Sequence, residues 1–237
     1  MSISVHNMFS SIASQYDKTN DFLSMGIHRL WRKQSLKFAK IDKSFPIHVA
    51  DLCCGTGDFL IATEKLVNKN SVFVGLDFVW NMLPIAKGKA AEIKTESNKA
   101  QNKLQFVRGD ALQTPFPDHA FDLCTIGFGI RNLDSTLDGL IEMKRILKKG
   151  GIVVILEFGT PHLIGFKQIF QAYSKYLMPI IGGLISGNKA AYEYLPETSA
   201  AYPCRADFCK IMEEAKFNDI RFKSFFGGIA YCYTARN

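Results

Sequence analysis

Residues 46–157 alternate between short apolar segments and segments that have the spacing of amphipathic helices. The apolar segments are rich in β-branched residues, which is typical of strands buried on both faces of a sheet. Strands of this kind that alternate with helices form a parallel sheet with helices on either side, so the pattern predicts a doubly wound α/β fold. The expected strands cover 46–54, 71–77, 103–110, 121–129 and 151–159, and the expected helices cover 58–68, 81–97 and 133–151, the last capped by Gly150.

The segments on either side of this core predict more helices and two more strands. Residues 217–236 contain two strand-like runs joined at Gly227-Gly228, which predicts a hairpin at the edge of the sheet. A length of 237 residues allows one large domain or two small ones, and no low-complexity linker divides the chain. We expect a single domain over 1–237 with N-terminal helices (1–45), a core (46–161), a mostly helical insertion (162–204), and a helix followed by the closing hairpin (205–237).

Apolar stretches and cysteines bear on the compartment. The runs 152–156 and 177–185 are much shorter than the roughly 20 residues that span a bilayer. The N-terminus does not have the basic, apolar and cleavage-site regions of a secretory signal. The six cysteines show no C-x-x-C spacing, and Cys53-Cys54 has no histidine cluster beside it, so we expect reduced thiols and no metal. These features together predict a cytoplasmic protein.

The formal net charge of +7 raises the question of an acidic partner. The excess is scattered along the chain. Its densest runs, 28–40 and 144–149, are typical of solvated helix faces. We therefore expect no nucleic-acid partner.

Two loops, at the ends of the first two predicted strands, predict a nucleoside site. Gly55 and Gly57 in "DLCCGTGD" allow a tight turn and let the backbone approach a ligand. Asp77 ends the next strand 20 residues after Gly57, the spacing at which an acid binds both ribose hydroxyls. A dinucleotide fingerprint would have a third glycine, under the pyrophosphate, where this chain has Leu60. Adenosylmethionine has no pyrophosphate, so the pattern favours adenosylmethionine.

Two further strand ends would complete this site. Asp110 follows the third strand, and its carboxylate can accept a hydrogen bond from an adenine amino group while Ala111 leaves room for the ring. An aspartate at such a position is also typical of a helix N-cap, which is the alternative. Gly127 ends the fourth strand, where a bound methionine moiety would pass.

Six motifs spread along the chain occur together: "YDKTNDFLSMGIHRLWR" (16–32), "DLCCGTGD" (51–58), "PFPDHAFD" (115–122), "GFGIRN" (127–132), "LEFGTP" (156–161) and "YLPETSAAYP" (194–203). With them the chain resembles the ubiquinone/menaquinone-biosynthesis C-methyltransferases, the UbiE/MenG family. The resemblance implies the fold of class I adenosylmethionine-dependent methyltransferases, a mostly parallel seven-stranded sheet with a C-terminal antiparallel hairpin and a helical N-terminal lid. It implies cofactor contacts at Thr56, Asp77, Asp110, Ala111 and Gly127, which join Gly55 and Gly57 of the glycine loop as cofactor-binding candidates.

Two departures from the family pattern concern packing. Cys54 stands where many members have a glycine, and we expect its small side chain to face the sheet. Trp80 stands where members commonly have a polar residue, and we interpret it as a core residue.

The resemblance implies transfer of a methyl group to a ring carbon of a reduced isoprenoid quinone. A ring carbon is a poor nucleophile unless the neighbouring hydroxyl ionises, and a free phenol has a pKa of about 10. The guanidinium of Arg131 stays protonated, so it can stabilise that oxyanion or polarise a water. We expect Asn132 and Asp58 to orient Arg131, which makes these three the catalytic candidates. The alternative is that Arg131 only pairs with Asp58 or Asp134 to close the loop.

The N-terminal motif supplies the candidates for substrate binding. Tyr16, Asn20 and His28 lie on predicted helices that would cover the crevice and receive the prenyl chain, although the aromatic residues there could equally form core. His28 has a side chain whose pKa suits proton transfer. Because the substrate lives in a bilayer, 28–40 and 162–186 are candidates for peripheral contact with anionic lipid. A homodimer is also compatible with the sequence.

Several functions compete at this point. Within the family the substrates are demethylmenaquinol, which the proline of "YLPE" favours, and a methoxylated polyprenyl benzoquinol. Outside it, the chain could methylate another small molecule or RNA, or be a non-catalytic adenosylmethionine-binding component of a quinone-synthesis complex. The chain has no appended RNA-binding module, and its intact loops with Arg131 favour catalysis.

Overall fold

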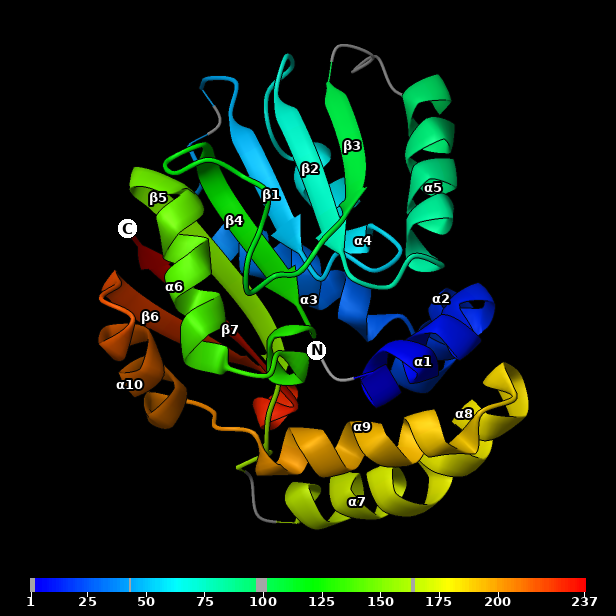
Figure 1. The fold of residues 1–237 in the computed structure, drawn as a ribbon. Helices are drawn as coiled ribbons and strands as arrows, with labels where there is room; N and C mark the ends of the chain where they lie inside the picture. The colour runs from blue at the N-terminus through cyan, green and yellow to red at the C-terminus, as the bar shows by residue number, and fades with distance from the viewer. Residues whose placement is uncertain (1–2, 43, 97–101, 163–164) are drawn as a thin grey trace.

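The structure is a computed structural model, and it describes the chain except residues 1–2, 43, 97–101 and 163–164. Its centre is a seven-stranded sheet in the order β3-β2-β1-β4-β5-β7-β6 (Figure 1). The strands are β1 (His48–Leu52), β2 (Val72–Asp77), β3 (Lys103–Arg108), β4 (Phe121–Gly127), β5 (Leu147–Phe158), β6 (Asn218–Phe225) and β7 (Ala230–Arg236). Strands β1 to β5 are parallel, whereas β7 is antiparallel to both β5 and β6. The predicted parallel sheet and edge hairpin are confirmed.

The strand order reverses beside β1. From β1 the chain moves outward through β2 and β3, and it then returns to place β4 against the other side of β1. In doubly wound sheets, ligands bind outside the carboxyl ends of the strands at such a reversal. The loops after β1 and β4 are therefore the expected walls of a binding site.

Helices cover both faces of the sheet (Figure 1). On one face, α3 (Ile27–Phe38), α4 (Asp58–Glu64) and α5 (Met82–Glu96) contribute apolar side chains to a core with β1, β2 and β4. On the other face, α6 (Thr136–Ile146) and α10 (Ala206–Glu214) contribute to a second core. Helix α5 agrees with the helix expected over 81–97, of which residue 97 lies outside the described residues.

A third group of helices lies beyond the carboxyl ends of the parallel strands (Figure 1). It contains α1 (Ile3–Ile12), α2 (Tyr16–Ser24), α7 (Phe166–Ala172), the π-helical turn Tyr173–Leu177, α8 (Met178–Ser186) and α9 (Lys189–Ala201). Helix α3 is different, because Trp31 and Leu36 are buried in the core of the sheet. Among the described residues of 1–45, α1 and α2 lie beyond the strand ends, whereas α3 packs on the sheet. Across the described residues, no helix combines the length and apolarity needed to cross a bilayer.

The helix cap expected at Gly150 is wrong. Helix α6 ends at Ile146, and Leu147 already pairs with Phe121 as the first residue of β5. Leu147 is completely buried, so a longer helix would remove this side chain from the core. Gly150 has a φ of 76°, next to an irregularity in the β4–β5 pairing. The glycine does supply a left-handed conformation, but inside an irregular strand rather than at a helix end.

Candidate active site

The loop after β1 turns sharply before α4. Cys53, Gly55 and Gly57 have φ values of 51°, 53° and 81°, which all lie in the left-handed region. This conformation costs little at the two glycines. Cys54 is buried, and its Sγ lies 2.9 Å from the position that a Cβ on Gly75 of β2 would occupy. The prediction that Cys54 faces the sheet is confirmed. A glycine-rich turn at this place leaves backbone accessible to a ligand.

Two of the predicted acids lie near the next strand ends. The Asp77 carboxylate accepts the N–H of Gly55 at 2.7 Å and that of Val79 at 2.8 Å, so it connects β2 to the first loop. Burial raises the pKa of Asp77, and these backbone hydrogen bonds oppose the rise. Asp110 accepts the N–H of Leu112 at 2.9 Å within a turn. The alternative that Asp110 is a helix N-cap is wrong, because the element that follows β3 is the strand β4.

Asp51, at the end of β1, is a residue that the sequence analysis missed. Its Oδ1 accepts the hydroxyl of Thr125 at 2.6 Å, whereas its Oδ2 is buried and has no hydrogen-bond partner in the described part of the structure. Burial raises the pKa of Asp51 to about 7, and the Thr125 hydrogen bond opposes the rise. An unpaired buried carboxylate oxygen that lines a cavity is suited to a cationic ligand group. The sequence feature that could have identified Asp51 is an acid near the end of the strand that leads into the glycine loop.

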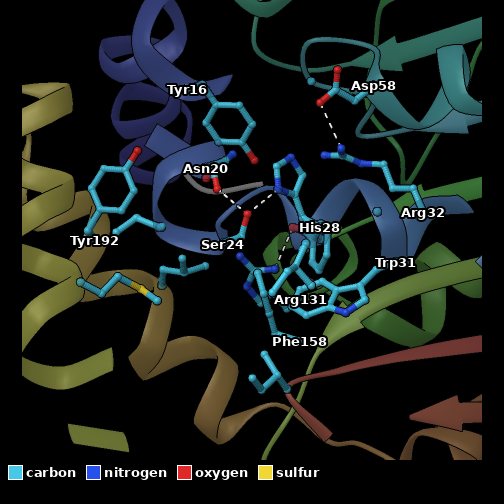
Figure 2. A pocket seen from close by; sticks show the side chains of 18 of the residues that line it. Tyr16, Asn20, Ser24, His28, Trp31, Arg32, Asp58, Arg131, Phe158 and Tyr192 are labelled. Carbon is cyan, nitrogen blue, oxygen red and sulfur yellow. Dashed lines mark hydrogen bonds and ion pairs between the residues drawn. The ribbon is translucent and has the colours of Figure 1, made fainter. Parts of the chain in front are cut away.

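A cavity of about 400 Å³ extends from this loop into the layer of helices, and we call it the first cavity. Cys53, Thr56 and Gly127 line it from the strand ends, and α2, α3, α7 and α9 enclose the rest. Figure 2 shows Tyr16 and Asn20 of α2, His28 of α3 and Arg131 of the turn after β4 pointing into the same space. Most of the lining is aromatic or aliphatic. The first cavity therefore joins the loops after β1 and β4 to the predicted substrate residues, whereas the predicted cofactor residues Asp77, Asp110 and Ala111 do not line it.

Arg131 lies in a short 3-10 turn after β4 and is almost completely buried, with 3% of its side chain exposed. Its Nη1 donates to Glu157 Oε1 at 2.5 Å and to the Phe128 carbonyl at 2.7 Å. The guanidinium also lies 5.4 Å from the centre of the Phe158 ring. Burial raises the pKa of Glu157, and Arg131 opposes the rise. Glu157 is the second residue that the sequence analysis missed, although it is the acid that ends the apolar run of β5.

The expected orientation of Arg131 by Asp58 is wrong. Asp58 instead pairs with Arg32, at 3.1 Å (Figure 2), and also with Lys89. Burial alone would raise the pKa of Asp58, but these two cations bring it below its usual value. The difference follows from where the two residues lie. Asp58 begins α4, beside Arg32 of α3 and Lys89 of α5, whereas Arg131 lies in the turn after β4, beside Glu157 of β5. Asn132 was also expected to hold Arg131, but its Oδ1 accepts the hydroxyl of Tyr194 at 3.1 Å.

A polar row on α2 and α3 faces the first cavity. Ser24 Oγ donates to the Asn20 carbonyl at 2.6 Å and lies 2.5 Å from His28 Nδ1 (Figure 2). Burial, together with Arg32, lowers the pKa of His28 to about 4, so its imidazole is neutral at pH 7. Burial raises the pKa of Tyr16, and Arg131 opposes the rise. The predicted residues Tyr16, Asn20 and His28 are thus brought together.

Helix α2 also contacts the glycine loop after β1 directly. The hydroxyl of Thr56 donates to Asp17 at 2.6 Å, and Lys89 of α5 donates to Asp17 at 2.8 Å and to Thr56 at 3.2 Å. Through the Lys89–Asp58 pair, this group extends to the start of α4. We call Asp17, Thr56, Asp58 and Lys89 the Lys89 cluster. It connects the N-terminal cover to the glycine loop.

Helix α1 covers the connection between β2 and α5. Asn81 donates to the hydroxyl of Ser10 at 2.6 Å, and the rings of His6 and Phe78 lie 5.4 Å apart. Trp80 in the same connection is 54% exposed, so the interpretation of Trp80 as a core residue is wrong. Its neighbour Val79 is buried in the core instead, because these two successive residues face opposite directions.

Known proteins place this arrangement in a family. The family model described as the ubiE/COQ5 methyltransferase family matches residues 1–236. The chain belongs to the ubiE/COQ5 methyltransferase family. It is similar to the demethylmenaquinone methyltransferase of Staphylococcus aureus strain MRSA252, with 40% identity over 226 residues that cover 95% of this chain and 90% of that protein.

Solved structures agree with the family in their fold. An adenosylmethionine-dependent methyltransferase of Thermotoga maritima, described as a possible histamine N-methyltransferase, matches with a TM-score of 0.65 and 16% identity, over 97% of this chain and 98% of that one. Phosphoethanolamine N-methyltransferase 2 of Haemonchus contortus, solved with adenosylmethionine, matches with a TM-score of 0.61 and 16% identity, over 87% of this chain and 52% of that one. The predicted class I methyltransferase fold is confirmed.

As a ubiE/COQ5 family member, the chain is an adenosylmethionine-dependent methyltransferase, as predicted. The elements that place its residues are the loops after β1 and β4 and the start of α2. Within the described residues, no three His, Cys, Asp or Glu side chains are grouped so that they could hold a metal ion. The charged side chains of the site are paired, as in Arg131–Glu157 and Asp58–Lys89, and lie beside apolar walls.

Proposed function

We propose that this enzyme methylates a ring carbon of reduced demethylmenaquinone, with adenosylmethionine as the methyl donor. The observation that carries the proposal is the first cavity, where apolar walls connect the cofactor loops to the buried Arg131–Glu157 pair. An aromatic ring with a prenyl chain suits such a lining. The 40% identical S. aureus relative is a demethylmenaquinone methyltransferase, which favours a naphthoquinol over a methoxylated benzoquinol.

The strand ends and loops beside the first cavity have residues that fit adenosylmethionine. The unpaired buried oxygen of Asp51 would accept its ammonium group, and Asp77 at the end of β2 would accept the ribose hydroxyls. When bound, adenosylmethionine supplies an electrophilic methyl group on a sulfonium. The proposal assigns the remaining contacts to Gly55, Thr56, Gly57, Asp110, Ala111 and Gly127.

Arg131 would bind the oxygen of the quinol. Its Nη1 is used by Glu157 and Phe128, whereas its Nε is buried with no partner among the described residues, which leaves a donor for a ligand oxygen. A fixed guanidinium in a water-poor cavity stabilises a developing phenolate much more than it would in bulk water. Ionisation of the hydroxyl makes the neighbouring ring carbon nucleophilic. Asn132 would act on the same wall by holding Tyr194.

His28 would accept the proton that leaves the ring. The new carbon–methyl bond forms as the methyl–sulfur bond breaks, and the electron pair of the ring C–H bond then returns to the ring while its proton transfers to the base. A neutral imidazole has one ring nitrogen without a proton. Asp21, whose Oδ1 is 3.5 Å from His28 Nε2, would stabilise the imidazolium that results.

The helical insertion would contact the membrane that holds the substrate. The chain has no acidic residue between Glu157 and Glu193, whereas this stretch carries Lys167, Lys175 and Lys189. On α7, the π-helical turn and α8, the exposed large apolar side chains are Ile169, Tyr176, Leu177, Ile180 and Leu184. Basic residues beside exposed apolar residues are typical of surfaces that bind anionic lipid. Cosedimentation with anionic vesicles at physiological salt tests this contact, and the homodimer stays a prediction for analytical ultracentrifugation.

Methylation of defined quinols tests the proposed function. The purified enzyme is incubated under reducing conditions with adenosylmethionine labelled in its methyl group and with either a prenylated naphthoquinol or a methoxylated prenyl benzoquinol. We expect label in the naphthoquinol ring. Label only in the benzoquinol would overturn the substrate assignment, and label in neither would overturn the function.

A further inference from the structure

A second cavity of about 440 Å³ lies behind the first, between the segment that follows β5, the π-helical turn with α8, and α9. The two cavities share five lining residues, all of them apolar: Phe158, Phe170, Met178, Leu195 and Ile229. One layer of side chains is therefore the boundary between them. The first cavity alone has room for a ring system of drug size.

The second cavity has an apolar interior and a polar edge. Pro161, Pro179 and Pro196 line its walls, and prolines at these positions present no backbone N–H to a ligand. Ser174 is buried there, and its hydroxyl has no hydrogen-bond partner among the described residues. The charged lining residues, such as Lys175, are exposed. A flexible apolar chain fits this lining better than a polar or charged ligand does.

We propose that the second cavity binds the isoprenoid tail of the quinol. This inference rests on the proposed function, which places the quinol ring in the first cavity beside Arg131. Phe158 contacts the Arg131 guanidinium and also lines both cavities, so it lies where the ring ends and the tail begins. The tail passes Phe158 between Met178 and Leu195 and enters the second cavity.

The far side of the second cavity agrees with this path. Its wall includes the π-helical turn and α8, whose outer surface carries the exposed Leu177 and Ile180. A tail that is longer than the cavity would therefore leave it at the surface proposed to contact lipid. The competing exit is beside Met25, which lines the first cavity and is 83% exposed.

Filling the second cavity tests the proposal. Ser174→Phe puts a ring into it, and Ala172→Phe puts the same ring on an exposed position two residues earlier in the same helical run. The value of kcat/KM is measured with a naphthoquinol that carries one prenyl unit and with one that carries several. We expect Ser174→Phe to lower kcat/KM for the long substrate by about tenfold or more relative to the short one, since each lost methylene contact costs discrimination. Ala172→Phe should change neither.

The outcomes separate the two proposals. An equal loss on both substrates, or no loss on either, would overturn the tail site while leaving the proposed function intact. If the wild-type enzyme methylates neither quinol, the proposed function fails.

Cross-linking of the wild-type enzyme keeps the test independent of folding in a variant. A long-tailed naphthoquinol with a diazirine near the middle of its tail is irradiated with the protein, and the labelled peptide is identified by mass spectrometry. Label in 170–179 or 193–200 supports the proposal. Label at the α2–α3 turn around Met25 would overturn it in favour of the competing exit.

Discussion

Two groups of charged side chains reach the first cavity, and they differ in how much solvent surrounds them. The Arg131–Glu157 pair is nearly dry, with side-chain exposures of 3% and 2%. In the Lys89 cluster, Lys89, Asp17 and Asp58 keep exposures of 27%, 32% and 25%. Breaking a buried pair leaves an uncompensated charge, whereas a partly exposed pair is screened by water. We call the Arg131–Glu157 pair the dry pair and the Lys89 cluster the wet cluster. The dry pair should therefore matter for both folding and chemistry, and the wet cluster mainly for how α2 is held against the glycine loop.

The largest effect should follow from breaking the dry pair on its acidic side. Glu157→Gln leaves the Arg131 guanidinium buried without a counterion, which should lower the free energy of unfolding by about 3–5 kcal/mol. Urea denaturation measures the change. The matched control is Lys210→Met, which breaks the exposed Lys210–Asp207 pair and should not move the transition. Similar shifts in both variants would contradict the contrast between dry and exposed pairs.

The next substitution keeps the positive charge at position 131 but changes the shape of the side chain. We expect a smaller effect on folding and a large effect on turnover. Arg131→Lys retains a cation for Glu157 but loses the planar fork with its several donors. We expect kcat to fall by about 100-fold, the size of a lost oxyanion donor, while the affinity for adenosylhomocysteine changes little. Steady-state kinetics measures kcat, and calorimetry measures the affinity for adenosylhomocysteine. Equal losses in kcat and affinity would mean that Arg131 only shapes the loop.

The pH dependence of unfolding should reveal His28, which lies near Arg32 at the edge of the Lys89 cluster. Its folded pKa of about 4 is below the ordinary 6.5, so between these values the unfolded chain binds a proton that the native chain does not. This lowers stability as the pH falls, by at most about 1.4 kcal/mol per pH unit. Unfolding curves from pH 4 to pH 7 should lose this component in His28→Gln.

Asp51 supplies an internal control of opposite sign. Its pKa is raised from 3.8 to about 7, so between these values the native chain binds the extra proton and gains stability as the pH falls. Asp51→Asn should therefore make the acid-side loss steeper, whereas His28→Gln should make it shallower. If both variants changed the acid-side loss of stability in the same direction, the pKa of one of the two residues would not be shifted in the direction that its burial predicts.

The smallest effect is expected in the wet cluster. Lys89→Met removes the shared partner of Asp17, Thr56 and Asp58, and solvent screening should keep the loss of stability to about 1 kcal/mol or less. We expect a severalfold weaker affinity for adenosylhomocysteine, because α2 is less firmly held to the glycine loop. Calorimetry measures it, with the exposed neighbour Lys87→Met as the matched control. A loss as large as that of Glu157→Gln would remove the contrast between the two groups.

The backbone features of the site were predictable because they are local. Gly55, Gly57 and Asp77 lie at strand ends that the apolar pattern predicts, and the topology of a parallel sheet brings those ends together. Gly150 shows the limit of such reasoning. Its left-handed backbone could be expected from glycine, but burial of Leu147 decided whether the conformation ended a helix or belonged to a strand.

The partners of the charged side chains were not predictable in the same way. Asp58, Asp134 and Glu157 are all acids near strand or helix ends, and nothing local favours one of them for Arg131. The parallel pairing of β4 with β5, in which Gly127 is opposite Leu156, brings Glu157 beside the turn that carries Arg131. Asp58 starts a helix that faces Arg32 and Lys89, so it was already neutralised.

The sequence by itself determined the sheet, the position of the glycine loop and the family, because apolar period, glycine placement and motif order can be read along the chain. Only the tertiary structure decided which acid neutralises Arg131, that Asp51 keeps an unpaired oxygen, and that a second apolar cavity adjoins the first. The physical reason is that charge pairing and cavity shape depend on side chains from distant segments, whose distances are set by how the strands and helices pack.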